Sequence, residues 1–414
     1  MKKKNIILIS VIFIIIVILV LLFVKLNFGK ENNNMIKPPD NNGTTLDFDY
    51  KIIKKVNEKY KGNYLVSPLS IAYALSMLND GASDKTKEEI NNLIKDYKFS
   101  KIPNVKDRIN IANALFIKNR FKNEINESYV NHIKSNYNAD TIYDEFNSPD
   151  KLNNWVKDKT YNMIPKLVDR LDPNFVLGIV NALAIDVEWN NKFKCENTKY
   201  GEFNLINGSK MDTAYMHQSE GNTYFETNNA KGSIKSYETY KNDNNESIDL
   251  EYIAILPNNI AEYINNFNLD ELHKIYNSTI TDNVKVNLAI PKYTYDFNYD
   301  NFKADLISLG IKEAFDEKNA SFKNITSNND VYVYDAIHKT HIDLSENGTK
   351  AAAVTAFLMD TNSAFEPEKK IIDIKFNKPF IYIIKEKSND NIWFFGEVYN
   401  PMKFEDNKDI CEVR

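Results

Sequence analysis

Cysteine is nearly absent from this chain, which has only Cys195 and Cys411 among its 414 residues. So few cysteines exclude a disulfide-rich scaffold and any zinc site built from four thiolates. The two residues could pair with each other, bridge two molecules or stay free. Glycine and proline are also scarce, at 12 residues each, which excludes a collagenous or linker-like architecture.

An excess of positive charge is missing too. Lysine and arginine total 52 against 57 aspartates and glutamates, which gives a formal net charge of -5. A nucleic-acid-binding protein carries a basic stripe or a basic domain, so we expect no nucleic-acid partner. The hydrophobic fraction of 43% and the charged fraction of 26% are those of a folded globular protein.

The motifs of an enzyme are missing as well. The sequence contains no His-Glu-x-x-His pattern, no Gly-x-Ser-x-Gly motif and no glycine-rich phosphate loop. Ser148 and Lys151 match a Ser-x-x-Lys spacing, but Lys-Thr-Gly is absent and Ser148 is predicted to cap a helix. His338 and His341, three residues apart on a predicted strand, point to opposite faces, which disfavours a metal pair. We expect no catalytic residue, metal or cofactor.

A long apolar run stands at the N-terminus. Residues 6–24 are interrupted only by Ser10 and follow three lysines. At about 1.5 Å per residue this run nearly crosses a hydrocarbon core of roughly 30 Å, and the lysines favour a cytoplasmic N-terminus. We therefore predict a signal anchor at residues 1–24, with a single membrane pass and an extracellular domain. A cleaved signal peptide and a secreted protein are the alternative.

The remaining chain is predicted to form one α+β domain at residues 46–403, between a flexible polar linker at 25–45 and a polar tail at 404–414. Helical patterns predominate early and strand patterns late. The apolar run 176–189 is typical of a strand buried on both faces. Helices are expected at 48–61, 70–77, 85–97, 148–167 and 301–309, and further strands at 110–117, 252–256, 284–290, 371–376 and 380–384.

One segment, at residues 346–356, is rich in small side chains. In an extended conformation Thr349, Ala351, Ala353 and Thr355 share one face. Small residues on that face let a strand enter between existing strands without a steric block. A short alanine-rich helix or a plain loop is the simpler interpretation of the segment alone.

The chain resembles the serpin family over residues 48–401. Several motifs carry the resemblance, in the family's order and spacing. They are Asn-Tyr-Leu-Val-Ser-Pro-Leu-Ser at 63–70, Thr-Lys-Glu-Glu-Ile at 86–90, Asn-Ala-Leu at 181–183 leading to Trp189, Val-Asn-Leu-Ala-Ile-Pro-Lys-Tyr at 286–293, Phe-Asn-Lys-Pro-Phe at 376–380 and Phe-Gly-Glu-Val-Tyr-Asn-Pro at 395–401.

The resemblance implies a serpin fold, with helices around a large central β-sheet and smaller sheets, and an exposed reactive-centre loop at about 346–370. It also implies a monomeric, irreversible suicide inhibitor of proteases, not an enzyme. After cleavage the loop would insert as a strand into the central sheet and trap the acyl-enzyme. A non-inhibitory serpin that acts as a surface binding or chaperone protein is the alternative, and a surface hydrolase using Ser148 is the least favoured one.

The resemblance also assigns residues to roles. The hinge that begins insertion would contain Glu346, Gly348, Thr349, Ala351, Ala352 and Ala353. Ser67, Ser70, Asn181 and His338 match the family's shutter cluster, and Trp189 matches the breach, where the strand first enters. Family spacing places the scissile bond between Asn362 and Ser363, with Asp360–Thr361 as the alternative. Such residues are poor bait for trypsin-like enzymes, so the target is a serine protease of other specificity or a cysteine protease.

Overall fold

The computed structural model describes residues 46–94, 97, 99, 102–173, 175–219, 221–327, 331–349 and 369–403. Several predicted features lie outside these residues: the anchor at 1–24, the linker at 25–45, the alanines 351–353, the candidate scissile bonds Asn362–Ser363 and Asp360–Thr361, and the tail at 404–414. In the part of the chain that is described, no helix is long and apolar enough to cross a membrane.

Helices begin where the sequence supplies caps. Ser67 accepts a hydrogen bond from the backbone of Ser70 and precedes Pro68, the first residue of α3. Asn259 and Asn268 cap α7 and α8 in the same way. The helices are α2 (Leu46–Lys59), α3 (Pro68–Gly81), α4 (Asp84–Ile94), α5 (Glu127–Tyr137), α6 (Asp150–Lys159), α7 (Ile260–Asn266), α8 (Leu269–Ser278) and α9 (Phe302–Ser308).

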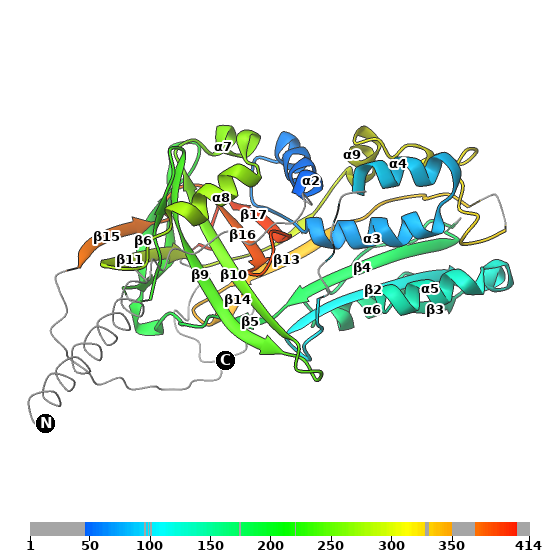
Figure 1. Cartoon of the computed structure of the whole chain (residues 1–414), viewed down its shortest axis with the longest axis horizontal. Coiled ribbons are helices and arrows are strands. Elements are labelled where there is room, and N and C mark those ends of the chain that lie inside the picture. Colours follow the sequence, from blue (N-terminus) through cyan, green and yellow to red (C-terminus); the bar gives the residue numbers. More distant parts are fainter. Residues whose placement is uncertain are drawn as a thin grey trace, which may run out of the picture.

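An antiparallel sheet forms much of the core at one end of the molecule, with the strand order β1-β17-β16-β10-β9-β8 (Figure 1). Strands β16 and β17 are almost entirely buried, which follows from their nearly continuous apolar sequence. The bounds are β1 (Tyr64–Val66), β8 (Phe225–Glu226), β9 (Ala230–Lys241), β10 (Ser247–Pro257), β16 (Phe380–Glu386) and β17 (Ile392–Val398).

A second sheet, with the order β15-β11-β7-β6, stands at the outer side of this end (Figure 1). Strands β11 and β15 run parallel, and β7 pairs antiparallel with both β11 and β6. The bounds are β6 (Thr198–Asn204), β7 (Lys210–Gln218), β11 (Val284–Pro291) and β15 (Lys370–Lys375). Strand β15 is the first described element after the predicted reactive-centre loop, so this sheet receives the far end of that loop.

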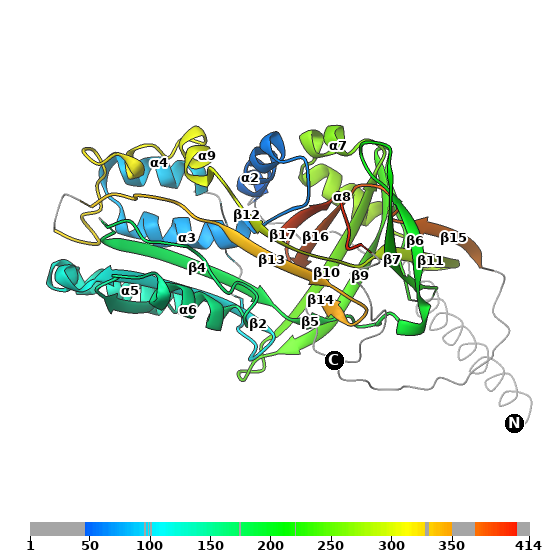
Figure 2. The same ribbon diagram turned by 180° about the vertical axis from the view of Figure 1, so that it is seen from behind.

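Two further ladders are β3-β2-β4 and β12-β13-β14-β5, and the first of them extends towards the end of the molecule opposite β15 (Figure 2). Strand β5 follows β4 after one residue, so the chain itself joins the ladders at that point. The strand bounds are β2 (Ile109–Lys118), β3 (Asp140–Asp144), β4 (Leu177–Ile185), β5 (Val187–Glu188), β12 (Tyr293–Asn298), β13 (Lys339–Leu344) and β14 (Gly348–Thr349).

Alternate side chains of β2 enter different apolar clusters. Leu115 and Ile117 belong to the main core, whereas Phe116 packs with Leu152 and Val156 of α6. Helix α6 therefore covers the face of the ladder that is turned away from the main core, as the period of two in a strand requires.

The α+β architecture is confirmed, but two local predictions were wrong. The helix expected at 148–167 ends at Lys159 because Tyr161 and Asn162 have left-handed backbone conformations. The carboxamide of Asn153 then accepts the backbone N–H groups of Leu167 and Val168 and holds the following chain. The first half of β4, expected to be buried on both faces, is only half-buried at 177–181.

Candidate functional site

A cavity of about 300 Å³ lies along β4 and explains the exposure of its first half. Its walls come mainly from β4, from α3, and from residues 331–338 with the first two residues of β13. Residues 331–338 form no strand, and within the described residues β4 pairs with β2 only. An extended segment placed between β4 and 331–338 would therefore find a hydrogen-bonding edge beside it and apolar side chains beneath it.

A chain of hydrogen bonds crosses the floor of this cavity. His338 Nε2 accepts the backbone N–H of Ser67 at 3.1 Å, and Ser67 Oγ accepts that of Ser70 at 3.2 Å. Ser70 Oγ donates to Asn181 Oδ1, and Asn181 Nδ2 donates to Asn113 Oδ1 at 2.8 Å. The structure thus brings together Ser67, Ser70, Asn181 and His338. Their hydrogen bonds link the segment that precedes β13 to α3, β4 and β2.

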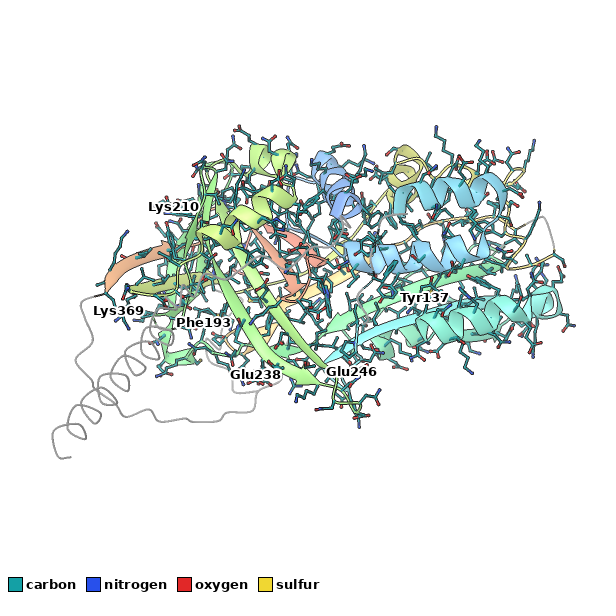
Figure 3. All side chains as sticks on the ribbon, in the orientation of Figure 1. Tyr137, Phe193, Lys210, Glu238, Glu246 and Lys369 are labelled. Atoms are coloured by element: carbon teal, nitrogen blue, oxygen red, sulfur yellow. The ribbon has the colours of Figure 1, made fainter. Side chains whose placement is uncertain are left out.

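His338 is neutral in this chain because burial lowers its pKa to about 4. A neutral imidazole keeps one nitrogen lone pair, which the Ser67 N–H requires. Asn113 was not predicted from the sequence, although a carboxamide inside the apolar run of β2 was a usable signal. It also donates to the backbone oxygen of Tyr137 at 2.8 Å, at the end of α5 (Figure 3).

The first residues of the predicted hinge already lie in a sheet. Gly348 pairs with Glu188 and Thr349 pairs with Val187, and Thr349 also pairs with Leu344 of β13. Strand β14 therefore stands between β5 and β13. A Cβ at Gly348 would lie 2.0 Å from the Val187 oxygen, so this position requires glycine.

Thr349 and Trp189 meet around one tyrosine. Thr349 is buried, and its Oγ1 lies 2.6 Å from the hydroxyl of Tyr237. The Trp189 ring stacks on the Tyr237 ring with centroids 4.4 Å apart. Trp189 also donates its backbone N–H to the Asn347 oxygen at 2.8 Å and its indole N–H to the Ser345 oxygen at 3.0 Å. Trp189 thus holds, by hydrogen bonds, the turn that precedes Gly348 and Thr349.

Glu346 is buried with a full set of partners. Its carboxylate accepts the Thr198 hydroxyl at 2.7 Å and lies 3.0 Å from the Lys292 ammonium. Its backbone oxygen accepts the Phe193 N–H at 3.1 Å. Sequence reasoning assigned no role to Tyr237, Thr198 or Lys292, because only the tertiary fold brings these residues to the hinge.

The remaining candidates lie elsewhere. The prediction that Ser148 caps a helix was wrong, because Pro149 occupies the capping position of α6. The Ser148 hydroxyl donates to the Asp150 carboxylate at 2.9 Å. His341 binds Asp296 at 2.7 Å, away from His338. No group of three or more histidine, cysteine, aspartate or glutamate side chains among the described residues could hold a metal ion.

Cys195, in the short turn before β6, is disulfide-bonded. The other cysteine of the sequence, Cys411, lies outside the described residues.

Residues 44–401 match the family model described as Serpin (serine protease inhibitor). This chain belongs to the serpin family. The match covers the ladders β3-β2-β4 and β12-β13-β14-β5, the hydrogen-bond chain on the cavity floor and the described hinge residues. The serpin fold, with helices and several β-sheets, is therefore confirmed.

Relatives of this serpin come from distant organisms. An uncharacterized serpin-like protein of Methanosarcina acetivorans is 30% identical, with 87% of this chain and 85% of the relative covered. A leukocyte elastase inhibitor of Xenopus tropicalis is 28% identical, with 86% and 97% covered. Among solved structures, the thermophilic serpin Tengpin in its native state is 30% identical, with a TM-score of 0.72 and 86% and 93% covered.

Proposed function

We propose that this serpin is an irreversible suicide inhibitor of proteases. The cavity between β4 and residues 331–338, with the hinge seated at its entry, is the observation that carries the proposal. A protease would cleave the loop at 346–370, and the freed loop would extend β14 as a new strand along the cavity. Members of the family include protease inhibitors, among them the elastase inhibitor to which this chain is similar.

The energy for the trap would come from the strand position itself. An inserted loop gains backbone hydrogen bonds to both neighbours, at about 1 kcal/mol net each, and buries its small side chains over α3. Before cleavage the loop is tethered at both ends, so the gain is withheld by a kinetic barrier. The acyl-enzyme, carried along by the inserting strand, would lose its catalytic geometry before it deacylates.

The residues at the scissile bond would determine which class of protease is the target. We place the scissile bond at Asn362–Ser363, with Asp360–Thr361 as the alternative register. The target is then a serine protease that accepts asparagine, aspartate or small residues, with a cysteine protease of similar preference as the second class. No nucleic acid and no cofactor takes part.

We further propose that the inhibitory domain, residues 46–403, is displayed as a monomer on the cell surface. Residues 6–24 would anchor it and residues 25–45 would act as the tether, while secretion after cleavage is the alternative. Extraction of membranes at high pH tests this: an anchored chain stays with the lipid, and a secreted one is found in the medium.

The inhibitory function is tested with the full chain purified in detergent. It is incubated with serine and cysteine proteases of varied specificity, and the products are separated on denaturing gels. A denaturant-resistant complex is expected, and the mass of the released C-terminal peptide identifies the scissile bond. Residual protease activity is measured alongside, because thioester adducts of cysteine proteases are labile. Cleavage across the panel without inhibition would contradict the proposal and favour a binding or chaperone role.

A further inference from the structure

Asparagine followed by glycine is a sequence in which the protein backbone readily attacks the asparagine side chain. Glycine has no side chain to hinder its backbone nitrogen, so this nitrogen can reach the carboxamide carbon of the residue before it. The described residues contain two such pairs, Asn347–Gly348 in the hinge and Asn207–Gly208 in the turn between β6 and β7. Asn347 is half-exposed, so water reaches its carboxamide.

The peptide group between Asn347 and Gly348 is held on both sides while the hinge is seated, that is, while β14 lies between β5 and β13. Its oxygen accepts the backbone N–H of Trp189 at 2.8 Å, and its N–H donates to the Ser345 oxygen at 3.3 Å. The Trp189 indole donates to the same Ser345 oxygen at 3.0 Å. The Gly348 nitrogen therefore cannot turn towards the Asn347 carboxamide until these hydrogen bonds are released.

The sheet around Gly348 leaves no room for a longer main chain. A Cβ at Gly348 would lie 2.0 Å from the Val187 oxygen and 2.7 Å from the Glu188 Cα. Gly348 pairs with Glu188 and Thr349 pairs with Val187, which fixes the register of β14 against β5. One additional main-chain atom before Gly348 would shift β14 along β5 and lose this register.

We propose that Asn347 is a site of spontaneous deamidation, and that the reaction requires release of the hinge. In the released hinge the Gly348 nitrogen bonds to Cγ of Asn347, and its proton leaves with the Nδ2 group as ammonia. The product is a cyclic imide, in which the Gly348 nitrogen is bonded to both carbonyl carbons of residue 347. One water molecule then breaks one of these two C–N bonds. Cleavage at Cγ gives aspartate, whereas cleavage at the main-chain carbonyl gives isoaspartate, which has one additional carbon in its main chain.

The two products differ in their effect on the hinge. Isoaspartate at position 347 keeps the hinge released, because its longer main chain cannot restore the register of β14. Aspartate keeps the ordinary main chain and a half-exposed side chain, so the hinge can be seated again. Deamidation to isoaspartate thus marks each copy whose hinge has opened. That such a copy no longer inhibits rests on the proposed function, but the deamidation itself does not.

Mass mapping of the full chain tests the dependence on hinge release. The chain is kept at mildly alkaline pH, folded or unfolded in urea, and isoaspartate at positions 347 and 207 is quantified over time. In urea the two Asn-Gly pairs should react at equal rates. In the folded chain Asn347 should react about tenfold or more slowly than in urea, because few molecules have the turn open. Asn207 is exposed, with open space around Gly208, and should be slowed less.

Trp189→Phe removes the indole N–H that holds the turn. It should raise the rate at Asn347 in the folded chain by about fivefold, the effect of one hydrogen bond. Trp155→Phe is the matched control, because the Trp155 indole also makes one hydrogen bond, to Asp140 on β3 at 2.9 Å, and it should leave the rate at Asn347 unchanged. An equal rate at Asn347 in the folded and the unfolded chain, or an unchanged rate in Trp189→Phe, would overturn the proposal.

Hydrogen exchange tests the effect of the product. The isoaspartate fraction is separated, and protection is measured for the amides of Trp189 and Phe193, which donate to the hinge oxygens of Asn347 and Glu346 (Figure 3). Isoaspartate should lower both protection factors by about tenfold or more. Asn347→Asp, which carries the charge without the additional carbon, should keep them, and undiminished protection in the isoaspartate fraction would contradict the loss of register. Because no protease enters either experiment, the expected rates in a chain that inhibits nothing would support the deamidation and reject the inhibitory function.

Discussion

Burial determines the protonation state of His338 in the candidate site. Burial lowers the pKa of His338 to about 4, and the neutral ring accepts the Ser67 N–H beneath the cavity. A protonated ring carries a hydrogen on both nitrogens, so Nε2 could no longer accept the Ser67 N–H and this hydrogen bond would be lost. The hydrogen-bond chain from residue 338 to α3 and β4 therefore depends on a neutral histidine.

This dependence predicts acid sensitivity. The unfolded histidine has a pKa near 6.5, so the stability that the neutral ring supplies is complete above that pH and is lost as pH falls towards 4. Between pH 7 and pH 4.5 the loss should reach about 2 kcal/mol in the free energy of unfolding. It is measured by denaturant unfolding at pH 7 and pH 4.5, in the unmodified chain and in His338→Gln, whose amide oxygen replaces Nε2.

The comparison between the two chains isolates this residue. Glu397, whose pKa burial raises to about 7, changes stability with pH in the opposite direction and is present in both chains. Equal losses in the unmodified chain and in His338→Gln would contradict the prediction.

At the scale of elements, β14 is the strand from which the proposed insertion would begin. Thr349 is buried against Tyr237 between β5 and β13, so each following residue of the loop would enter along the same line. A long charged side chain at this position would have to be buried without a partner, which costs several kcal/mol.

On the proposed mechanism, Thr349→Arg should therefore convert the chain from an inhibitor into a substrate. Cleavage of the loop should continue at the same bond, while the yield of trapped complex falls by about tenfold or more. The ratio of complex to cleaved chain on a denaturing gel measures this. Thr349→Ser, which keeps the hydroxyl for Tyr237, is the control and should trap as well as the unmodified chain. Undiminished trapping by Thr349→Arg would remove strand insertion from the mechanism.

Local sequence patterns predicted the helices and strands better than they predicted which residues contact one another in the fold. The apolar runs at 110–117 and 380–384 correspond closely to β2 and β16, because their periodicity reports burial directly. The same reasoning overestimated the burial of β4, since a strand position without a neighbour leaves no trace in the strand's own sequence. The four cavity-floor residues came from the family resemblance. Asn113 was missed although a carboxamide within an apolar run was a usable signal, whereas Tyr237 could be found only from the folded chain.

At the scale of the whole molecule, a covalent link bears on stability. Cys195 is disulfide-bonded, and we predict that its partner is Cys411, the other cysteine of the sequence. A cross-link between such distant positions restricts the unfolded chain and typically contributes about 2 to 4 kcal/mol.

Cys195→Ser and Cys411→Ser should lower the melting temperature equally, and the double variant should melt no lower than either. Thermal unfolding without reductant measures this, and a peptide map without reduction identifies the bond. Two titratable thiols in the unreduced, unfolded chain would contradict the pairing.

The unoccupied strand position beside β4 also sets how this protein would be used up. On the proposed mechanism, the free energy that drives insertion is stored once, during folding, so each copy would act only once. Protection would then depend on the number of intact copies and on the rate of synthesis, as with a consumable reagent. On the same mechanism, an uncut copy whose loop extended β14 along the cavity would also be lost to inhibition, so the number of active copies would fall with time even without a protease.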